Sequence, residues 1–204
     1  AVTDLGDIDI DGTLTVSASG QTIDLSGGGS NDVTGAVTLT GSAVTLADTT
    51  ATSIAGITAT GALNLTSGGE VTQSGAIDAD STASVTAGAN AITLTNAGND
   101  FTGAVSLSNS GAFDVALTDA NALDLGTVVV GQDLTVTTGG ALTDSGAVTV
   151  VGLGTIVSTG FDVTLGDSTT ANFGSLDFSG ATVSITEASA MEVAASEATG
   201  ELTL

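Results

Sequence analysis

Several short stretches of the chain alternate strictly between apolar and polar residues. The clearest are residues 13–16 (TLTV), 37–40 (VTLT), 92–95 (ITLT) and 134–137 (LTVT). A period of two places Leu, Val and Ile on one face of an extended strand and Thr on the other. The pattern therefore predicts short β-strands that each bury one face.

Turn-forming residues separate these stretches. Gly, Asn, Asp and Ser gather at residues 27–32 (GGGSND) and 96–100 (NAGND), which is typical of tight connections between strands. Helix-favouring Lys and Arg are absent, and Gly interrupts every potential helical run. We therefore expect an all-β chain.

The sequence repeats itself at a spacing of about 70 residues. Residues 31–40 (NDVTGAVTLT) match residues 99–108 (NDFTGAVSLS), and residues 171–179 (ANFGSLDFS) form a looser third copy. Further segments align in the same way: 1–10 with 71–80 and 141–150, 21–27 with 90–96 and 161–167, 43–48 with 114–119 and 182–187, 61–69 with 131–140, and 133–136 with 201–204. We interpret the chain as a single domain, residues 1–204, made of three units at 1–70, 71–140 and 141–204.

Short alternating strands with Gly-rich corners suit either a sandwich of hairpins or a parallel β-helix. The repeat runs without linkers and without Pro, and Asp11-Gly12 is the one dipeptide with a hairpin signature. These features favour the β-helix, a solenoid in which each unit makes about three coils of roughly 20 to 25 residues. The chain would then make roughly nine coils and a rod of about 40 Å. Val33, Phe101 and Phe173 occupy equivalent positions and are expected in its core.

The segment 187–198 (EASAMEVAASEA) is rich in Ala and Glu and looks locally helical. The repeat instead aligns Met191-Glu192-Val193 with Leu123-Asp124-Leu125. We therefore expect strand rather than helix in this segment.

The charge balance excludes several classes of function. The chain has no Lys, Arg, His or Cys, and 23 Asp and Glu give a formal net charge of −23. Nothing can neutralise phosphates, so nucleic acid is not expected as a partner. No apolar run approaches the ~20 residues of a membrane span, so membrane insertion is not expected either. No basic leader segment precedes the repeats, and we expect a processed product or a piece of a longer protein.

The sharpest motif is Asp7-Ile8-Asp9-Ile10-Asp11-Gly12, which matches the start of an EF-hand calcium loop. Ala18 stands where that loop needs a bidentate Glu, and the equivalent segments at 76–81 and 147–152 lose most of the acids. The repeat thus preserves apolar alternation, which favours a strand with Asp facing outward. Asp7, Asp9 and Asp11 remain a weak candidate for a surface cation site that would bind Ca²⁺ or other cations loosely.

Catalysis would have to rely on carboxylates and hydroxyls. A carboxylate pair could hydrolyse glycans, but no acid stands out by its context, and the usual general bases are missing. We expect no enzyme activity, no catalytic residue and no cofactor. A polysaccharide-active β-helix enzyme is a minor alternative.

Residues 91–150 (AITLTNAGNDFTGAVSLSNSGAFDVALTDANALDLGTVVVGQDLTVTTGGALTDSGAVTV) resemble the repeats of very large bacterial exoproteins of the filamentous haemagglutinin type, which use two-partner secretion. The resemblance extends over essentially the whole chain. It implies a right-handed parallel β-helix, secretion to the surface of a Gram-negative cell, and a long adhesive or structural fibre. The N-terminal secretion domain of that family is not recognisable in this sequence.

We therefore expect a non-catalytic structural or adhesive segment of a secreted, cell-surface fibre. Its partners would be flanking repeats of a longer chain, other copies of itself, or glycans and proteins on a host or neighbouring cell. The alternative is a subunit that polymerises end to end into an extracellular filament or sheath, because the ends of a β-helix expose unpaired strand edges.

Overall fold

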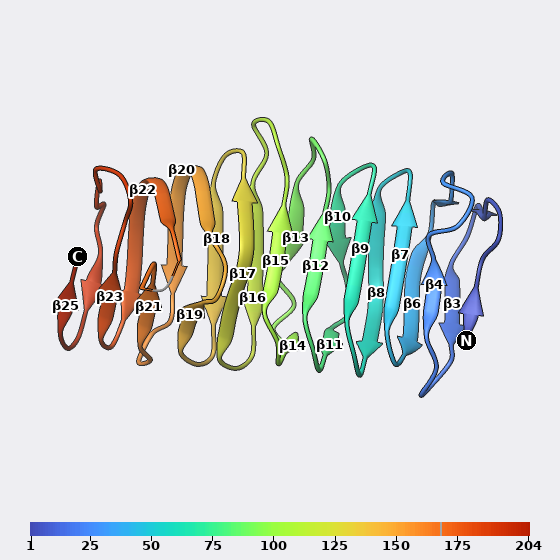
Figure 1. Ribbon diagram of the computed structural model, residues 1–204, viewed down its shortest axis with the longest axis horizontal. Coiled ribbons are helices and arrows are strands. Elements are labelled where there is room, and N and C mark those ends of the chain that lie inside the picture. Colours follow the sequence, from blue (N-terminus) through green and yellow to red (C-terminus); the bar gives the residue numbers. More distant parts are fainter. Residues whose placement is uncertain (168) are drawn as a thin grey trace.

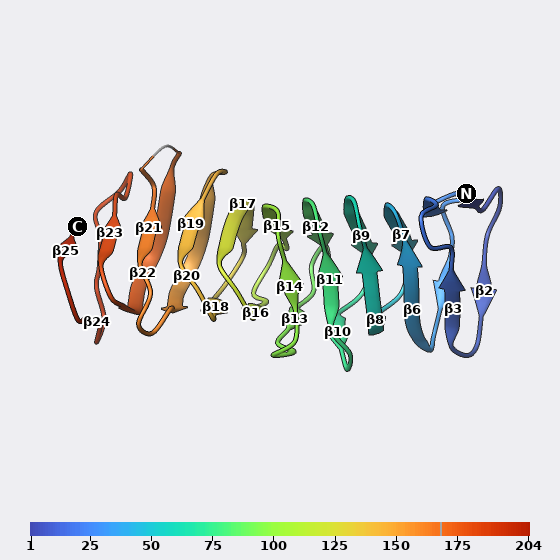
Figure 2. The same cartoon turned by 90° about the horizontal axis from the view of Figure 1, so that it is seen from below.

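The protein is a β-solenoid. The computed structural model describes residues 1–167 and 169–204, and these residues form strands, turns and bends without any helix. The strands pair in parallel and stack into one column of about ten turns. Figure 1 shows the column lengthwise, with the two ends of the chain at opposite ends of the rod, and Figure 2 shows the same stacking from below. The predicted all-β parallel solenoid is confirmed.

The strands are short. Those of the N-terminal half are β1 (Val2–Thr3), β2 (Asp9–Ile10), β3 (Leu14–Ser17), β4 (Ile23–Leu25), β5 (Asp32–Val33), β6 (Ala36–Gly41), β7 (Val44–Asp48), β8 (Thr52–Ala59), β9 (Leu63–Ser67), β10 (Val71–Gln73), β11 (Ile77–Ala79), β12 (Ala83–Thr86), β13 (Ile92–Leu94) and β14 (Asp100–Phe101). Those of the C-terminal half are β15 (Val105–Ser108), β16 (Val115–Asp119), β17 (Leu123–Val130), β18 (Leu134–Thr138), β19 (Leu142–Asp144), β20 (Val148–Val157), β21 (Val163–Leu165), β22 (Ala171–Gly180), β23 (Val183–Ile185), β24 (Glu197–Ala198) and β25 (Leu202–Thr203).

Alternation decides which side chains enter the column. In β9 the residues Leu63 and Leu65 are buried while Asn64 and Thr66 are exposed. Aliphatic residues of successive coils then stack in register, as in the series Val44, Leu63, Ala83 and Val105. Val33, Phe101 and Phe173 lie in this core, as predicted.

The coils are slightly shorter than expected, which changes the number of turns per repeat. Three coils carry the chain from Val44 to Val105. Val115, the equivalent of Val44 in the next copy of the repeat, instead belongs to the series Thr52, Val71, Ile92 and Val115. Thr52 begins β8, which follows β7 on the other side of the same coil (Figure 1). One copy of the repeat therefore spans three and a half coils, and the rod has about ten turns where nine were expected.

The half coil places successive copies of the repeat on alternate sides of the rod. Strand β7 of the first copy and β16 of the second share sequence and position, yet β7 pairs with β4 and β9 whereas β16 pairs with β13 and β18. Strand β23, the third equivalent, pairs with β21 and β25 and returns to the side of β7. Neighbouring copies are thus related by a half turn about the rod axis together with a translation along it.

Burial is lost at both ends of the rod. Strands β1 and β25 are exposed throughout, whereas the central strand β18 buries every second residue. The Ala- and Glu-rich segment 187–198 contains no helix, as predicted. It has parallel bridges at Glu187 and Val193 and the short strand β24, while its other residues lie outside the strands, where strand was expected.

Candidate functional site

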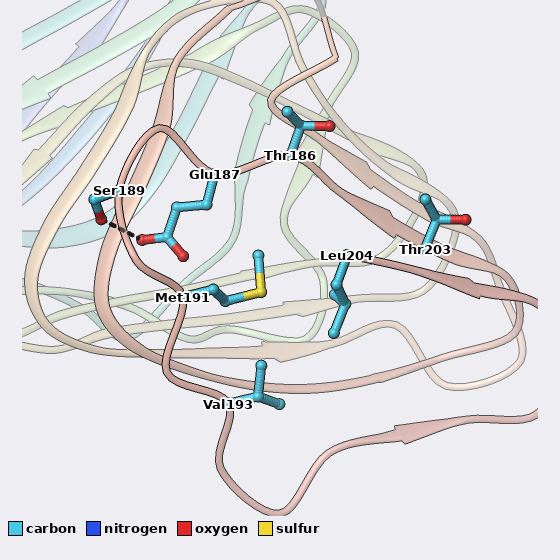
Figure 3. A pocket seen from close by; sticks show the side chains of 7 residues that line it. All are labelled: Thr186, Glu187, Ser189, Met191, Val193, Thr203 and Leu204. Atoms are coloured by element: carbon cyan, nitrogen blue, oxygen red, sulfur yellow. Dashed lines mark hydrogen bonds between the residues drawn. The ribbon is translucent and has the colours of Figure 1, made fainter.

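The C-terminal end of the rod contains an open hollow of about 580 Å³. Its lining comes from the last coil: Thr186, Glu187, Ser189, Met191, Val193, Thr203 and Leu204. Figure 3 shows that Met191, Val193 and Leu204 point toward one another across the inside of this coil. Each is a residue that faces the column, left uncovered because the described residues end with this turn.

One carboxylate lies at the margin of the hollow. The Glu187 Oε1 accepts a hydrogen bond from the Ser189 hydroxyl at 3.1 Å (Figure 3). It also accepts one from the Phe173 backbone N–H at 2.8 Å. The other oxygen, Oε2, is buried and has no hydrogen-bond partner among the described residues. The apolar side chains of the hollow, Met191, Val193 and Leu204, are suited to pack against other apolar side chains. The polar contact at its margin is the Ser189 hydroxyl on the Glu187 carboxylate.

Glu187 belongs to a motif that occurs once in each copy of the repeat. Asp48, Asp119 and Glu187 end the equivalent segments AVTLAD, DVALTD and TVSITE. Each accepts a hydrogen bond from the backbone N–H of an equivalent core residue: Val33 at 3.4 Å, Phe101 at 3.0 Å and Phe173 at 2.8 Å. The acid therefore ties the end of one strand to the adjacent coil.

Two of these acids are inside the rod, since Asp48 and Asp119 are 3% and 1% exposed, and Glu187 is partly buried at the end of the rod. Burial raises the pKa of Asp119 above its ordinary value, and the charge of Asp100 adds to this, while backbone N–H groups of Phe101, Asn121 and Ala120 act in the opposite direction. The Asp119 Oδ2 has no hydrogen-bond partner among the described residues.

Buried amides hold the longer turns. The Asn31 Oδ1 accepts from the Ile8 backbone N–H, and its Nδ2 donates to Asp4 Oδ2 and to the Leu25 carbonyl, each at 2.9 Å. Asn99, its equivalent, accepts from the Ile77 N–H at 2.9 Å and donates to the Leu94 carbonyl at 3.2 Å. Such contacts satisfy backbone groups where the chain leaves the strand ladder.

The sequence did not identify these buried polar residues as such, because Asp was interpreted as facing outward. A signal was present, since Asp48 follows Val44 and Leu46 at the same period of two that places them inside. Asp119 follows Val115 and Leu117 at the same period of two.

The predicted cation site lies at the other end of the rod. Asp7, Asp9 and Asp11 are all exposed, and Asp9 sits beside Asp32 of the next coil. In the part of the chain that the structure describes, no group of three or more Asp or Glu residues is arranged to hold a metal ion. A loose surface cation site at these three residues stays a prediction.

The outer surface carries further acids in neighbouring coils. Asp78 and Asp100 are partners in adjacent strands. Partial burial raises the pKa of Asp78, and the charges of Asp80 and Asp100 raise it further.

Residues 1–167 and 169–204 contain no helix with the length and apolar character of a membrane span.

The fold and its periodic core define a β-solenoid repeat protein. A family model described as "Repeats of unknown function (DUF5649)" matches residues 41–108 and again residues 112–179, two ranges that are one copy of the repeat apart. Because the two matches together cover two thirds of the sequence, the chain belongs to this family of repeats. Comparison with curated proteins and with solved structures gave no match.

Proposed function

We propose that the chain is a non-catalytic structural segment, a stiff rod that extends an adhesive or structural fibre outside a bacterial cell. The observation that carries this proposal is the column of buried, mostly aliphatic side chains that runs through every central coil from β6 to β23. Such a column resists bending and lengthens by adding coils that repeat the same contacts. About ten coils at ~4.8 Å each give a rod of roughly 48 Å.

The surface composition supports an exposed location. A net charge of −23 keeps rods soluble and limits lateral association. The absence of Lys and Arg removes every cleavage site for trypsin-like proteases. Carboxylates, Thr and Ser line the outside, where glycans or proteins of another cell could be bound weakly.

Surface labelling of cells tests the location. Antibodies raised against residues 1–204 should label intact cells of the source organism as strongly as permeabilised cells. Labelling only after permeabilisation would contradict the proposal. Small-angle X-ray scattering of the purified chain tests the rod, since a globular distance distribution would be incompatible with it.

Incubation with acidic and neutral glycans tests the absence of catalysis. We expect no turnover above that of a heat-unfolded sample. Turnover that a single Asp→Asn substitution abolishes would establish the enzyme alternative instead.

A further inference from the structure

We propose that Asn64 is a glycosylation site, at which the cell attaches a sugar to the side-chain amide nitrogen. Of the eight Asn residues in the chain, Asn64 is the one followed two positions later by Ser or Thr. The resulting motif, Asn64-Leu65-Thr66, is the acceptor sequence for N-linked glycans. The inference rests on the proposed function, because this modification belongs to the exposed surfaces of secreted proteins. It goes further by naming one residue and the chemical group attached to it.

Asn64 and Thr66 lie on the outer face of the rod. Both are exposed members of β9, whose other positions Leu63 and Leu65 are buried. A period of two places the Asn64 amide and the Thr66 hydroxyl on the same side of the strand. Strand β9 pairs with β7 on one side and with β12 on the other (Figure 1). Coils added at either end of the rod would therefore stack on other strands and leave this face uncovered.

The Asn64 side chain has no structural task of the kind that other Asn residues perform. Asn31 and Asn99 are buried and hold turns through several hydrogen bonds. Asn172, which also lies within a strand, accepts a hydrogen bond from the Ser189 hydroxyl. Among the described residues, the Asn64 side chain makes no hydrogen bond. Its amide is therefore free to react.

The repeat shows that the fold does not require Asn at this position. Strands β9, β18 and β25 are equivalent, and each pairs with the equivalent preceding strand, β7, β16 or β23. Asn64 corresponds to Thr135 in β18 and to Thr203 in β25. Thr is favoured in strands, whereas Asn is disfavoured. Asn64 thus weakens the local preference for strand without gaining a contact, which points to a role outside folding.

The surface around Asn64 has room for a sugar ring. Thr45 and Ser84 are its direct neighbours in the two adjacent coils. Ala47 and Thr86 occupy the next outward positions of the same two strands. These side chains are small and uncharged, and the hydroxyl groups among them can exchange hydrogen bonds with a sugar.

A glycan at Asn64 would cover a part of the rod that charge protects least. The outward positions of β7, β9, β12 and β15 contain no Asp or Glu, although the chain has 23 of these residues. Electrostatic repulsion between rods is therefore weakest at this face. A bulky, hydrated sugar there would hinder lateral contact between rods.

The transfer balances when the donor is an activated sugar. This donor class carries the sugar through its anomeric carbon on a diphosphate, which is attached to a nucleotide or to a lipid. The Asn64 side-chain nitrogen forms a bond to the anomeric carbon, the bond from that carbon to the diphosphate oxygen breaks, and the diphosphate leaves with the electron pair. The amide nitrogen loses one proton. Because β9 is paired on both sides in the folded rod, a transferase of the cell would act before the chain folds.

Peptide mass spectrometry of the chain isolated from its source organism tests the proposal. Cleavage of the denatured chain after Asp and Glu releases residues 49–70, in which Asn64 is the single Asn. We expect this peptide to carry the added mass of a sugar, and Asn64→Gln, produced in the same cells, should abolish it. A single sugar residue would indicate a nucleotide-linked donor, and a longer preassembled glycan would indicate a lipid-linked donor.

Further variants separate a sugar on Asn64 from one on the neighbouring hydroxyl. Thr66→Ala should abolish the modification, and Thr66→Ser should retain it, because Ser also supplies the hydroxyl of the motif. Asn121→Gln is the matched control and should change nothing, since Asn121 is exposed but has Leu123 two positions later. Thr135→Asn should add a second sugar, because it creates the motif with Thr137 at the equivalent position of β18.

Loss of the sugar in both Asn64→Gln and Thr66→Ala supports the proposal. An unmodified peptide 49–70, or a sugar that remains in Asn64→Gln, would overturn it. An unmodified chain that scatters as a rod and labels intact cells would refute the glycan alone and leave the proposed function standing.

Discussion

Strand β18 in the middle of the rod and β25 at its C-terminal end have almost the same sequence and very different surroundings. Leu134-Thr135-Val136 and Leu202-Thr203-Leu204 occupy the same position of the repeat. Leu134 and Val136 are completely buried, whereas Leu202 and Leu204 are about half exposed. Since the local pattern is the same, the difference comes from the coil that covers β18 and is missing from β25. In this fold a residue becomes core through its neighbours in the next coil.

Truncating the two equivalent leucines should give the largest contrast. Leu134→Ala is expected to lower the free energy of unfolding by about 2–5 kcal/mol, because it leaves a cavity among fixed neighbours. Leu202→Ala should cost less than about 1 kcal/mol, because water already reaches that side chain. Urea unfolding of dilute monomer, followed by circular dichroism, measures both. Equal losses in the free energy of unfolding would show that the ends of the rod are packed as tightly as its centre.

Equivalent glycines should show a smaller contrast of the same kind. A Cβ at Gly75 would overlap the carbonyl oxygen of Ala55 in the preceding coil, while one at Gly6 meets nothing. Gly75→Ala should therefore destabilise the rod by about 1–3 kcal/mol. Gly6→Ala should be neutral or slightly stabilising, because it restricts the unfolded chain. Thermal unfolding of the two variants checks this, and a loss at Gly6 would mean that the N-terminal coil has another neighbour.

The smallest contrast is expected between a buried and an exposed acid. Asp119→Asn keeps an oxygen for the Phe101 N–H and replaces an unpartnered charged atom by a neutral one, whose burial costs less. It should raise the free energy of unfolding by about 1 kcal/mol at pH 7. Asp9→Asn at the exposed N-terminal end should change it by less than about 0.5 kcal/mol. Equal effects of the two substitutions would contradict a special cost of the buried charge.

The pH dependence of the same pair sharpens this test. The pKa of Asp119 is raised in the folded protein, so the folded state holds its proton more strongly than the unfolded state. Stability should then rise as the pH falls through this raised pKa toward the ordinary value of 3.8. Asp119→Asn should flatten that part of the profile relative to the unsubstituted chain. Stability measured by urea unfolding between neutral pH and about pH 4 shows whether this holds.

The sequence alone predicts the fold class and most of the strands. Alternation at 37–40 and 134–137 falls inside β6 and β18, and the repeat correctly argued against a helix near Met191, where Val193 forms an isolated bridge. The number of coils per repeat could not be read in this way, because turn lengths vary and one-residue bulges interrupt the register after Val37 and Val105. Of the candidate site, the sequence located neither the open hollow nor the buried acids. The hollow exists only because the last coil is uncovered. The acids were expected on the outside because of their residue type, although their spacing of two from the buried residues of β7 and β16 places Asp48 and Asp119 inside.

The half turn between successive copies also affects how the rod presents itself to other molecules. Any side chain repeated in every copy appears alternately on the front and the back of the rod, about 17 Å apart along its length. It returns to the same side only after about 34 Å. A longer array of these repeats would therefore be two-sided by construction, able to bridge two surfaces at once but without one face reserved for either.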